Sequence, residues 1–551
     1  GVGSIARPLR TISEAWSRIP RDVTLTQGYR IMLRPGHWSE AQMPNYWESR
    51  HGTASAPIFV QAAGAPGSAH LAAMNVFDTD HLYLIGVHLR ARGGDVFHCE
   101  QCTHLLIRDS IIEGVGDVMN DGGPHEGIKI NQSSHVYIEH SDIQGAAQNP
   151  IDFVAVQHGH VITSTIHRGG DWCHYMKGGS AYLTVEANEY YNCGTGGFLA
   201  GQGTGFEYMV APWLYHEAVD MKFVNNLVHH VEGAAFGVNG AHSVLLAHNS
   251  AWRVGTRSHV LEFAMGGRSC DGDSVQCAAN NTVGGWGPVS PDQAPDGEPV
   301  GNAHVYAYAN AIANPAGAGS QWQHLQVDAP RTAGQHSNIP SPQVADDDLR
   351  IVGNGVFNGP ADHPLGIDGD TGGCPVGNIT CNANQLAADN VFAAGTSSVF
   401  AHPGAGVFTP AGALLAMTAG AAPPFAFDDL PGGQPAGSML NEVPVDRAGN
   451  VRTAGSPPGA FIRDAALSRT IVRYGVRGRG HVRPDRFGVR CAAVTCSAAY
   501  EAQAWVTLRA RPAAGWRFAR WRGRCAGWHG ATCILPAQGK SGVARAVFIP
   551  R

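Results

Sequence analysis

A short motif recurs through the middle of the chain and constrains the fold more than any other feature. From residue 80 it appears as YLIGVHL, LLIRDSI, YIEHSDI, VITSTI, VEANEY, FVNNLV, LAHNSA and CAANNTV, each ending in a polar residue and then an apolar one. The final residues are 22, 32, 23, 24, 38, 23 and 32 positions apart, so three intervals carry an insertion. Short strands at such a period are typical of a solenoid whose coils stack on one another.

Composition and cysteine content agree with an exported all-β protein. The chain has 71 glycines, 44% hydrophobic and only 15% charged residues, which suits a turn-rich β structure. No apolar run is long enough for a membrane span, and the first residue is Gly, so we expect a mature or trimmed form. The even number of cysteines in close pairs predicts disulfides, and hence a secreted, cell-surface or periplasmic location. The expected pairs are Cys99/Cys102, Cys173/Cys193, Cys270/Cys277, Cys374/Cys381, Cys491/Cys496 and Cys525/Cys533. The alternative for the first pair is a zinc site with His98 and His104.

Both ends of the repeat region carry further signals. RPLRTISEAWSRIP (7–20) predicts a short capping helix, and YRIMLRPGHWSE (29–40) resembles the segment that opens many β-helices. VDRAGNVRTAGSPPGAF (445–461) resembles their closing segment. Over residues 1–464 the chain therefore resembles the pectate-lyase-like superfamily, which implies a right-handed parallel β-helix, an all-β solenoid with an N-terminal capping helix.

The C-terminal residues differ sharply in charge. Residues 468–551 hold 16 Lys and Arg against 2 Asp and Glu, a net of +14, whereas the rest of the chain has a net of −20. We expect a small, basic, disulfide-containing β-rich domain over 465–551. VTLRARPAAGWRFARWRGRCAGWHGATC, followed by ARAVFIP, resembles the internalin-type B-repeats of exported bacterial proteins. The charge has two interpretations, a solvated basic surface or docking to an anionic polymer or cell surface; a nucleic-acid partner is not expected.

Lysine is rare, with 4 lysines against 34 arginines. Arginine cannot give up its proton in a protein but lysine can, so each lysine is informative. Lys129 aligns with Asp152 one coil later, and with Lys177 a further coil on if one residue is dropped from the turn. Alternation points all three outward and predicts a Lys-Asp-Lys ladder on one outer face. It is either an ion-pair ladder of little energetic value or a catalytic site. Lys222, in the other strand register, is expected to be structural.

The surroundings of the ladder favour chemistry on an acidic polysaccharide. His158 follows Asp152, and His174 and Tyr175 precede Lys177. Uronate lyases of the superfamily remove the proton next to a carboxylate, while calcium or a cationic side chain neutralises that carboxylate. KINQSSHVYIEHSDI with VQHGHVITSTI is similar to the chondroitinase-B and alginate-lyase branch, which implies that Lys129 is the base. Gln157 stands where that branch has arginine, and Lys177 or His158 could replace the missing cation. The predicted catalytic residues are Lys129, Asp152, His158 and Lys177.

Three insertions, near 114–124, 204–219 and 266–276, are expected to form walls along a groove. The second carries Phe206, Tyr208, Trp213 and Tyr215, which either stack on sugar rings or pack the loop. The predicted substrate-binding residues are His174, Tyr175, Tyr208, Trp213 and Tyr215. CDGDSVQC and IDGDTGGC could hold calcium, although disulfide-closed turns explain both more simply; the cofactor therefore stays open, with calcium as the candidate.

These patterns predict a polysaccharide lyase that cleaves a uronate-containing polymer by β-elimination. One alternative is a glycoside hydrolase that uses Asp152 with Asp171 or Glu126. The other is a non-catalytic polysaccharide-binding protein or adhesin, in which the lysines would lie on a flat, exposed face.

Overall fold

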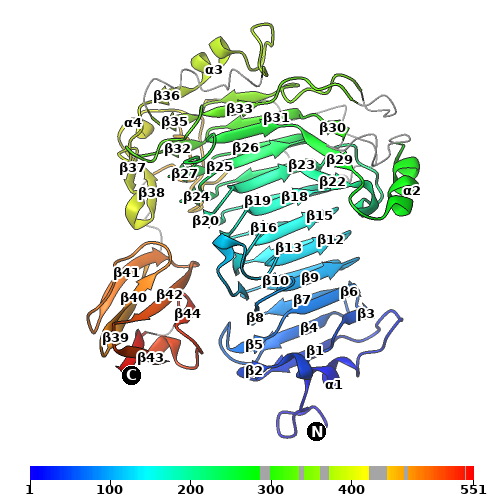
Figure 1. The fold of residues 1–551 in the computed structure, drawn as a ribbon, viewed down its shortest axis with the longest axis vertical. Helices are drawn as coiled ribbons and strands as arrows, with labels where there is room; N and C mark the ends of the chain where they lie inside the picture. Colours follow the sequence, from blue (N-terminus) through cyan, green and yellow to red (C-terminus); the bar gives the residue numbers. More distant parts are fainter. Residues whose placement is uncertain (286–297, 334–339, 360–371, 421–442, 464–468, 540) are drawn as a thin grey trace.

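The chain folds into a parallel β-helix with a small β module at its side (Figure 1). The computed structural model describes residues 1–285, 298–333, 340–359, 372–420, 443–463, 469–539 and 541–551. Each coil supplies one strand to each of three faces, and every strand pairs in parallel with its counterparts in neighbouring coils. The predicted all-β fold is confirmed.

The first face consists of β3 (Trp47–His51), β6 (Met74–Asp80), β9 (Phe97–Glu100), β12 (Ile128–Asn131), β15 (Ile151–Val154), β18 (Trp172–Lys177), β21 (Gly196–Gly201), β25 (Ala234–Asn239), β28 (Leu261–Ala264) and β33 (Leu325–Val327). The second face consists of β1 (Tyr29–Leu33), β4 (Ile58–Ala62), β7 (Leu82–Ile85), β10 (Thr103–Arg108), β13 (Ser134–Glu139), β16 (Gln157–Ile162), β19 (Ser180–Glu186), β23 (Ala218–Val224), β26 (Ala241–Ala247), β31 (Ala303–Tyr308) and β34 (Arg350–Val352). The third face consists of β2 (Gly36–Trp38), β5 (Ala69–Leu71), β8 (Val87–Ala91), β11 (Ile111–Gly114), β14 (Asp142–Ala146), β17 (Thr165–Gly169), β20 (Glu189–Cys193), β24 (Leu227–His229), β27 (Ser250–Trp252), β32 (Ala311–Ala313), β35 (Gly355–Phe357) and β36 (Val391–Ala393).

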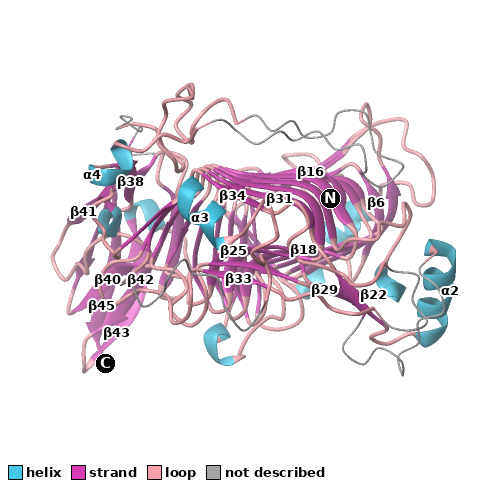
Figure 2. Cartoon of the chain, turned by 90° about the horizontal axis from the view of Figure 1, so that it is seen from above, coloured by secondary structure: helices cyan, strands magenta, loops and turns pink. Residues whose placement is uncertain are grey.

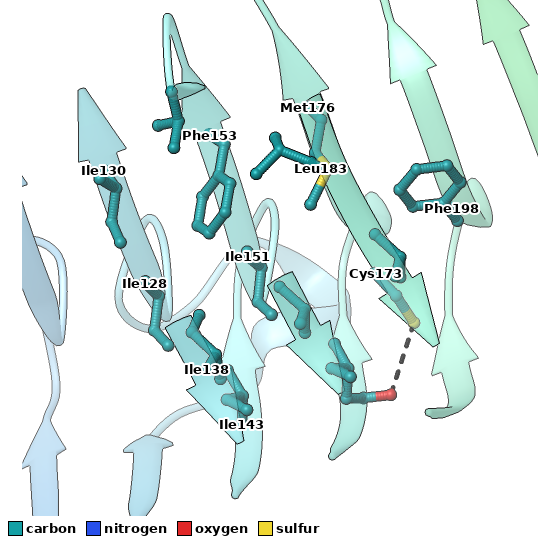
Figure 3. Close-up of a cluster of buried hydrophobic side chains, with 14 of the residues drawn as sticks. Ile128, Ile130, Ile138, Ile143, Ile151, Phe153, Cys173, Met176, Leu183 and Phe198 are labelled. Atoms are coloured by element: carbon teal, nitrogen blue, oxygen red, sulfur yellow. Dashed lines mark hydrogen bonds between the residues drawn. The ribbon is translucent and has the colours of Figure 1, made fainter. Parts of the chain in front are cut away.

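Alternating apolar residues fill the interior of the coils. Ile128 and Ile130 lie in register with Ile151 and Phe153 of the next coil, and all four are fully buried (Figure 3). Burying one such side chain contributes about 1.5–3 kcal/mol. The residues between them point outward, because successive side chains of a strand face opposite sides. This alternation fixes which residues can form a surface site.

A serine or asparagine at the corner between the second and third faces of each coil forms a buried ladder. The backbone N–H of Asn188 donates to Oδ1 of Asn226 at 2.9 Å, and that of Asn226 donates to Oδ1 of Asn249 at 2.9 Å. The ladder consists of Ser110, Ser141, Ser164, Asn188, Asn226, Asn249, Asn310, Asn354 and Asn390. Its members satisfy buried backbone groups at the corner, where no strand partner is available.

The last of the eight motifs was assigned incorrectly. CAANNTV lies in α2 (Ser274–Gly284), a helix at the side of the solenoid, and the coil instead continues through β31 and β32. Asp273 caps this helix by accepting from the N–H groups of Val275 and Gln276 at 3.0 and 2.9 Å. The segment matches the amino-acid pattern of a coil end, but the helix cap and the Cys270–Cys277 disulfide favour a helix there.

The predicted capping helix is present as α1 (Ile12–Trp16), which begins after Thr11, whose hydroxyl accepts from the N–H of Glu14 at 3.1 Å. The helix buries Ile12 and Trp16, and Trp16 packs edge-on against Trp47 of the first face. It therefore covers the open N-terminal end of the solenoid, where unpaired strands would otherwise be exposed.

The C-terminal module has its own core and packs on the third face (Figure 1). Trp505 and Ile534 contact Ile111, and the indole N–H of Trp505 donates to the carbonyl of His140 at 2.9 Å. One sheet contains β39 (Arg469–Arg477), β41 (Cys496–Glu501), β43 (Trp516–Arg522) and β45 (Val543–Pro550); the other contains β40 (Gly480–Pro484), β42 (Trp505–Pro512) and β44 (Thr532–Pro536). The resemblance of this module to internalin-type repeats stays a prediction.

All twelve cysteines form the six predicted local disulfides. The zinc interpretation at Cys99 and Cys102 is therefore wrong, because both sulfurs are bonded to each other. Among the described residues, no helix is both long and apolar enough to cross a membrane.

Candidate functional site

The predicted lysines converge on one carboxylate of the first face. Lys129 lies directly beside Asp152 in the ladder, and its Nζ forms an ion pair with Oδ2 of that residue. Nζ of Lys177 lies 4.0 Å from the same oxygen. The predicted register of Lys177 was wrong by two positions, because Tyr175 pairs with Asp152 and Lys177 pairs with Val154. Its long side chain nevertheless reaches back to the carboxylate.

We call Lys129, Asp152, Tyr175, Lys177 and Gln202 the lysine site. The Asp152 side chain is only 2% exposed, whereas those of Lys129 and Lys177 are 22% and 17% exposed. Lys177 donates to Oε1 of Gln202 at 2.7 Å, and Gln202 donates to the Tyr175 hydroxyl at 3.2 Å. The anion is thus hidden beneath two cations that solvent can reach.

The charges of the lysine site favour a bound anion. Burial opposes the ionisation of Asp152, but Lys177 and Lys129 outweigh it and hold the pKa of this carboxyl below its usual value. Burial and the nearby Asp152 raise the pKa of Glu126 to about 9, so this buried carboxyl is neutral at neutral pH. Within the lysine site itself, two lysine side chains then face one carboxylate; Asp95, outside the site, also acts on Lys129.

The same ion pair bears on the predicted role of Lys129. Burial lowers the pKa of this ammonium group, yet Asp152, and then Glu126 and Asp95, raise it above its ordinary value overall. A general base must be deprotonated at the working pH. The resting structure therefore favours Lys129 as a cation that binds a carboxylate over Lys129 as the base.

His174 does not belong to the surface of the site, so the geometry does not favour its predicted substrate contact. It is fully buried between Phe153 and Phe198, and its Nδ1 lies 3.1 Å from the Tyr190 hydroxyl. Burial lowers the pKa of its imidazole to about 3. The alternation that points Lys177 outward necessarily points His174 inward.

His158 lies on the second face, in a column of stacked rings. It stacks on His135 at 5.0 Å and on Tyr182 at 4.9 Å between ring centroids, and His104 and His81 continue the column. Burial and the neighbouring His135 lower the pKa of His158. These contacts describe a structural stack, and the catalytic role of His158 stays a prediction that the geometry does not favour.

A further imidazole lies beside Lys129 on the first face. His98 of β9 pairs with Lys129 in the ladder, and its Nε2 is 3.4 Å from the amide nitrogen of Asn131. It lines a hollow of about 210 Å³ together with Tyr46, Glu48, Asn75, Val76, Phe77 and Glu100. The sequence interpretation considered His98 only for zinc. The buried Phe97 and Cys99 on either side could have marked it as an outward residue of this face.

Insertions flank the first face at both edges. The segment containing η2 (Val118–Asn120) precedes β12, whereas η3 (Phe206–Tyr208), β22 (Gly203–Gly205), β29 (Gly266–Ser269) and α2 follow the strands of this face. Figure 2 shows α2, β22 and β29 on the side away from the C-terminal module. The carbonyl of Tyr208 accepts from the Gln132 side chain at 3.2 Å, which ties the second insertion to the coil of Lys129.

The predicted aromatic contacts differ in exposure. Tyr208 is 44% exposed and Tyr215 43% exposed, and the charge of Lys129 acts on the Tyr208 hydroxyl, whose pKa is raised by burial. Trp213 packs into the insertion against a buried cluster that includes Phe206. Tyr175 is only 4% exposed, so it positions Lys177 and Gln202 instead of stacking on a sugar. Tyr208 is therefore the aromatic residue best placed beside the lysine site.

The first calcium candidate has other structural roles. Asp273 caps α2, and Glu207 accepts from the N–H groups of Asp271 and Gly272 at 2.7 Å each. The cysteines close to Glu207 and to Asp346 are bonded in disulfides and offer no thiolate. Residues 367–371 of the second candidate lie outside the described residues.

Comparisons with known proteins agree with the fold. Residues 95–270 match the family model of the right handed beta helix region, which gives the solenoid its predicted hand. The structure is similar to a PL6 family polysaccharide lyase from Pseudopedobacter saltans, with a TM-score of 0.38, 12% identity, and coverage of 70% of this chain and 91% of that chain. It is similar to a pectate lyase, with a TM-score of 0.38, 12% identity and coverage of 84% and 92%. It is also similar to the A-module of a mannuronan C-5 epimerase from Azotobacter vinelandii, with a TM-score of 0.30, 11% identity and coverage of 67% and 87%.

No curated protein matches the sequence. At these levels of similarity, the chemistry of the chain has to be inferred from its own residues.

Proposed function

We propose that the protein is an exported polysaccharide lyase that binds a uronate-containing polymer across the first face and cleaves it by β-elimination. The observation that carries the proposal is the pair of solvent-accessible ammonium groups held over one buried carboxylate. Six disulfides support export, because such bonds persist in oxidising compartments.

In this mechanism Lys129 and Lys177 bind the carboxylate of the sugar whose proton is removed. As that proton leaves, negative charge spreads into the carboxylate, and fixed cations stabilise the transition state more than the bound substrate. Asp152 raises the pKa of Lys129 against the effect of burial, and it lies within ion-pair distance of both ammonium groups. These three residues therefore supply charge and position, and the base has to come from elsewhere.

His98 is the candidate base. Its imidazole lies next to Lys129 in the same ladder and lines the hollow beside the lysine site. An imidazole is the side chain best suited to accept a proton near neutral pH. A sugar bound over Lys129 would extend its neighbouring unit toward this hollow and toward Tyr208.

Hydrolysis by a carboxylate pair has less support. Asp152 and Glu126 are each 1% exposed, so neither carboxyl is accessible to a glycosidic bond. A polysaccharide-binding protein without catalysis would use the same cations and is the alternative that the experiment has to separate.

The test is the ultraviolet absorbance of unsaturated uronate ends, measured on pectate, alginate, glucuronan and glycosaminoglycans with and without a chelator. A rise that persists with chelator and is lost in Lys129→Ala supports lysine-assisted β-elimination. A rise abolished by chelator assigns the neutralising role to a metal such as calcium. New reducing ends without absorbance would indicate hydrolysis, and no reaction combined with polymer binding would indicate an adhesin.

A further inference from the structure

A second cationic site lies on the opposite flank of the solenoid, between the third face and the C-terminal module. A cavity of about 830 Å³ opens there, bounded by β17, β20, β24 and β27 on one side and by β40 and β42 on the other. Its lining includes the arginines Arg168, Arg483, Arg486, Arg490, Arg509 and Arg511 and one carboxylate, Asp485. We call this cavity the arginine cleft.

The mouth of the cleft carries uncompensated charge. Arg483, Arg490 and Arg511 are exposed, and all three act on His481, whose pKa is lowered by burial and by these cations. Within the described part of the chain, none of the three has an acidic partner at ion-pair distance. Like charges brought together at one opening raise the energy of the free protein, and a bound anion would relieve that repulsion.

The floor of the cleft offers unused donors. Arg486 is buried and forms an ion pair with Glu189 of β20, yet its Nε has no hydrogen-bond partner. Arg509 holds Asp485 through Nε at 2.6 and 2.8 Å, and its Nη2 is also buried without a partner. Leaving such a donor unsatisfied typically costs about 1–3 kcal/mol. Both residues line the cleft, so its wall holds buried donors that have no partner among the described residues.

The remaining lining forms the wall of the cleft. Tyr191, Trp252 and Phe487 border the cavity but are only 1%, 6% and 8% exposed, so the guanidinium groups are its main contacts for a ligand. Guanidinium groups bind carboxylates through two parallel hydrogen bonds. The volume also falls within the range of pockets that enclose small ligands, about 300–1,000 Å³.

We propose that the arginine cleft is a second binding site for an acidic polysaccharide, which holds a few carboxylated sugar units away from the lysine site. The choice of ligand rests on the proposed function, whereas the existence of an anion site rests on the cleft itself. The cleft exists only where the basic module packs against the third face.

The experiment is isothermal titration calorimetry of the full chain with hexasaccharides of galacturonate and of alginate, with neutral cellohexaose as the ligand control. The cleft variant is Arg483→Gln/Arg490→Gln/Arg511→Gln. The matched control is Arg517→Gln/Arg520→Gln/Arg522→Gln, which removes three exposed arginines of β43 outside the cleft. Lys129→Gln/Lys177→Gln removes the cations of the other site.

Wild type and the matched control are expected to bind two acidic hexasaccharides, whereas the cleft and lysine variants should each keep one site at wild-type affinity and bind more weakly at the other. In the cleft variant the affinity of the cleft should fall about tenfold, since each exposed charge contact contributes about 0.2–1 kcal/mol. Equal losses in the cleft variant and the matched control, or no loss in the cleft variant, would overturn the proposal. So would tighter binding of single-stranded DNA at the cleft than of either hexasaccharide.

These measurements separate failure of the proposed lyase function from failure of the proposed binding site in the arginine cleft. If a hexasaccharide binds in the cleft but no substrate is cleaved, the cleft is still a binding site and the proposed lyase activity is wrong. If wild type shows a single binding event and the cleft variant cleaves short substrates at the wild-type rate, the lyase activity stands and the cleft is not a binding site.

Discussion

The lysine site and the arginine cleft are both cationic, but they are built in different ways. The lysine site lies on four consecutive coils, and Lys129 and Asp152 are 23 residues apart. The cleft joins segments from distant parts of the chain, since Arg486 and Glu189 are 297 residues apart. The first arises from the repeat itself and the second from docking of the module. Surface charge alone therefore does not distinguish a site that the coil register creates from one that tertiary packing creates.

The largest expected effect concerns the docking contact. Among the described residues, Arg486→Ala leaves the buried Glu189 with only the neutral His229 as an ion-pair or hydrogen-bond partner, and breaking a buried ion pair in this way costs about 3–5 kcal/mol. Urea unfolding followed by tryptophan fluorescence measures the loss, and limited proteolysis reports release of the module. The double variant Arg486→Met/Glu189→Gln should recover part of the stability. A cost no larger than that of an exposed pair would show that this contact does not hold the module.

The lysine site should respond in activity. Lys129→Ala and Lys177→Ala are each expected to lower kcat/KM on the acidic polymer by about 10²–10³-fold, the usual loss when one charge-stabilising group is removed. Lys222→Ala, on β23 of the second face, is the matched control and should leave kcat/KM unchanged. Unchanged turnover in both site variants would remove these lysines from the mechanism.

The buried Glu126, close to the lysine site, should make folding stability depend on pH in the direction opposite to that of Asp152. The pKa of Glu126 is raised from 4.5 to about 9, so folding holds a proton that the unfolded chain releases, and stability falls as pH rises through that interval. Glu126→Gln removes this loss, so its gain in the free energy of unfolding over wild type should grow across the interval and reach at least about 1 kcal/mol, close to the equivalent of one pKa unit. A gain independent of pH would mean that Glu126 is ionised in the folded protein.

Asp152 supplies the contrast within the same site. Its folded pKa is lowered from 3.8, so its stabilising effect is present above that value and is lost as pH falls through the lower folded pKa. Asp152→Asn should therefore lower Tm at neutral pH and approach wild type only in acid. Thermal unfolding of both variants across pH measures the two opposite slopes.

The smallest effect is expected for an arginine in neither site. Arg21 and Glu48 form an ion pair at 3.1 Å with 53% and 35% of their side chains exposed. Arg21→Gln should cost less than about 1 kcal/mol, as exposed pairs do. Urea unfolding of this variant provides the baseline against which Arg486→Ala is judged.

Local pattern predicted the solenoid and half of the lysine site. The alternation in the motif fixed Ile128 inward and Lys129 outward, and the 23-residue spacing correctly placed Asp152 beside Lys129. The same method put Lys177 in the wrong register, because it shifted the next coil to align a lysine, whereas the 23-residue spacing continues unchanged and pairs Asp152 with Tyr175. It also grouped His158 and His174 with the lysines by nearness in sequence, although one lies on another face and the other in the core. The prediction that CAANNTV ends a coil was wrong because a helix cap and a disulfide favour a helix there.

The sequence by itself determined the coils, the disulfide pairs and the outward direction of Lys129 and Asp152, because strand alternation and short loops are local properties. The tertiary structure alone decided that the ion pair raises the pKa of Lys129, that His98 lies beside it, and that the basic module packs on the third face to form the arginine cleft. These features depend on which distant groups share a low-dielectric space, and neither spacing nor composition contains that information.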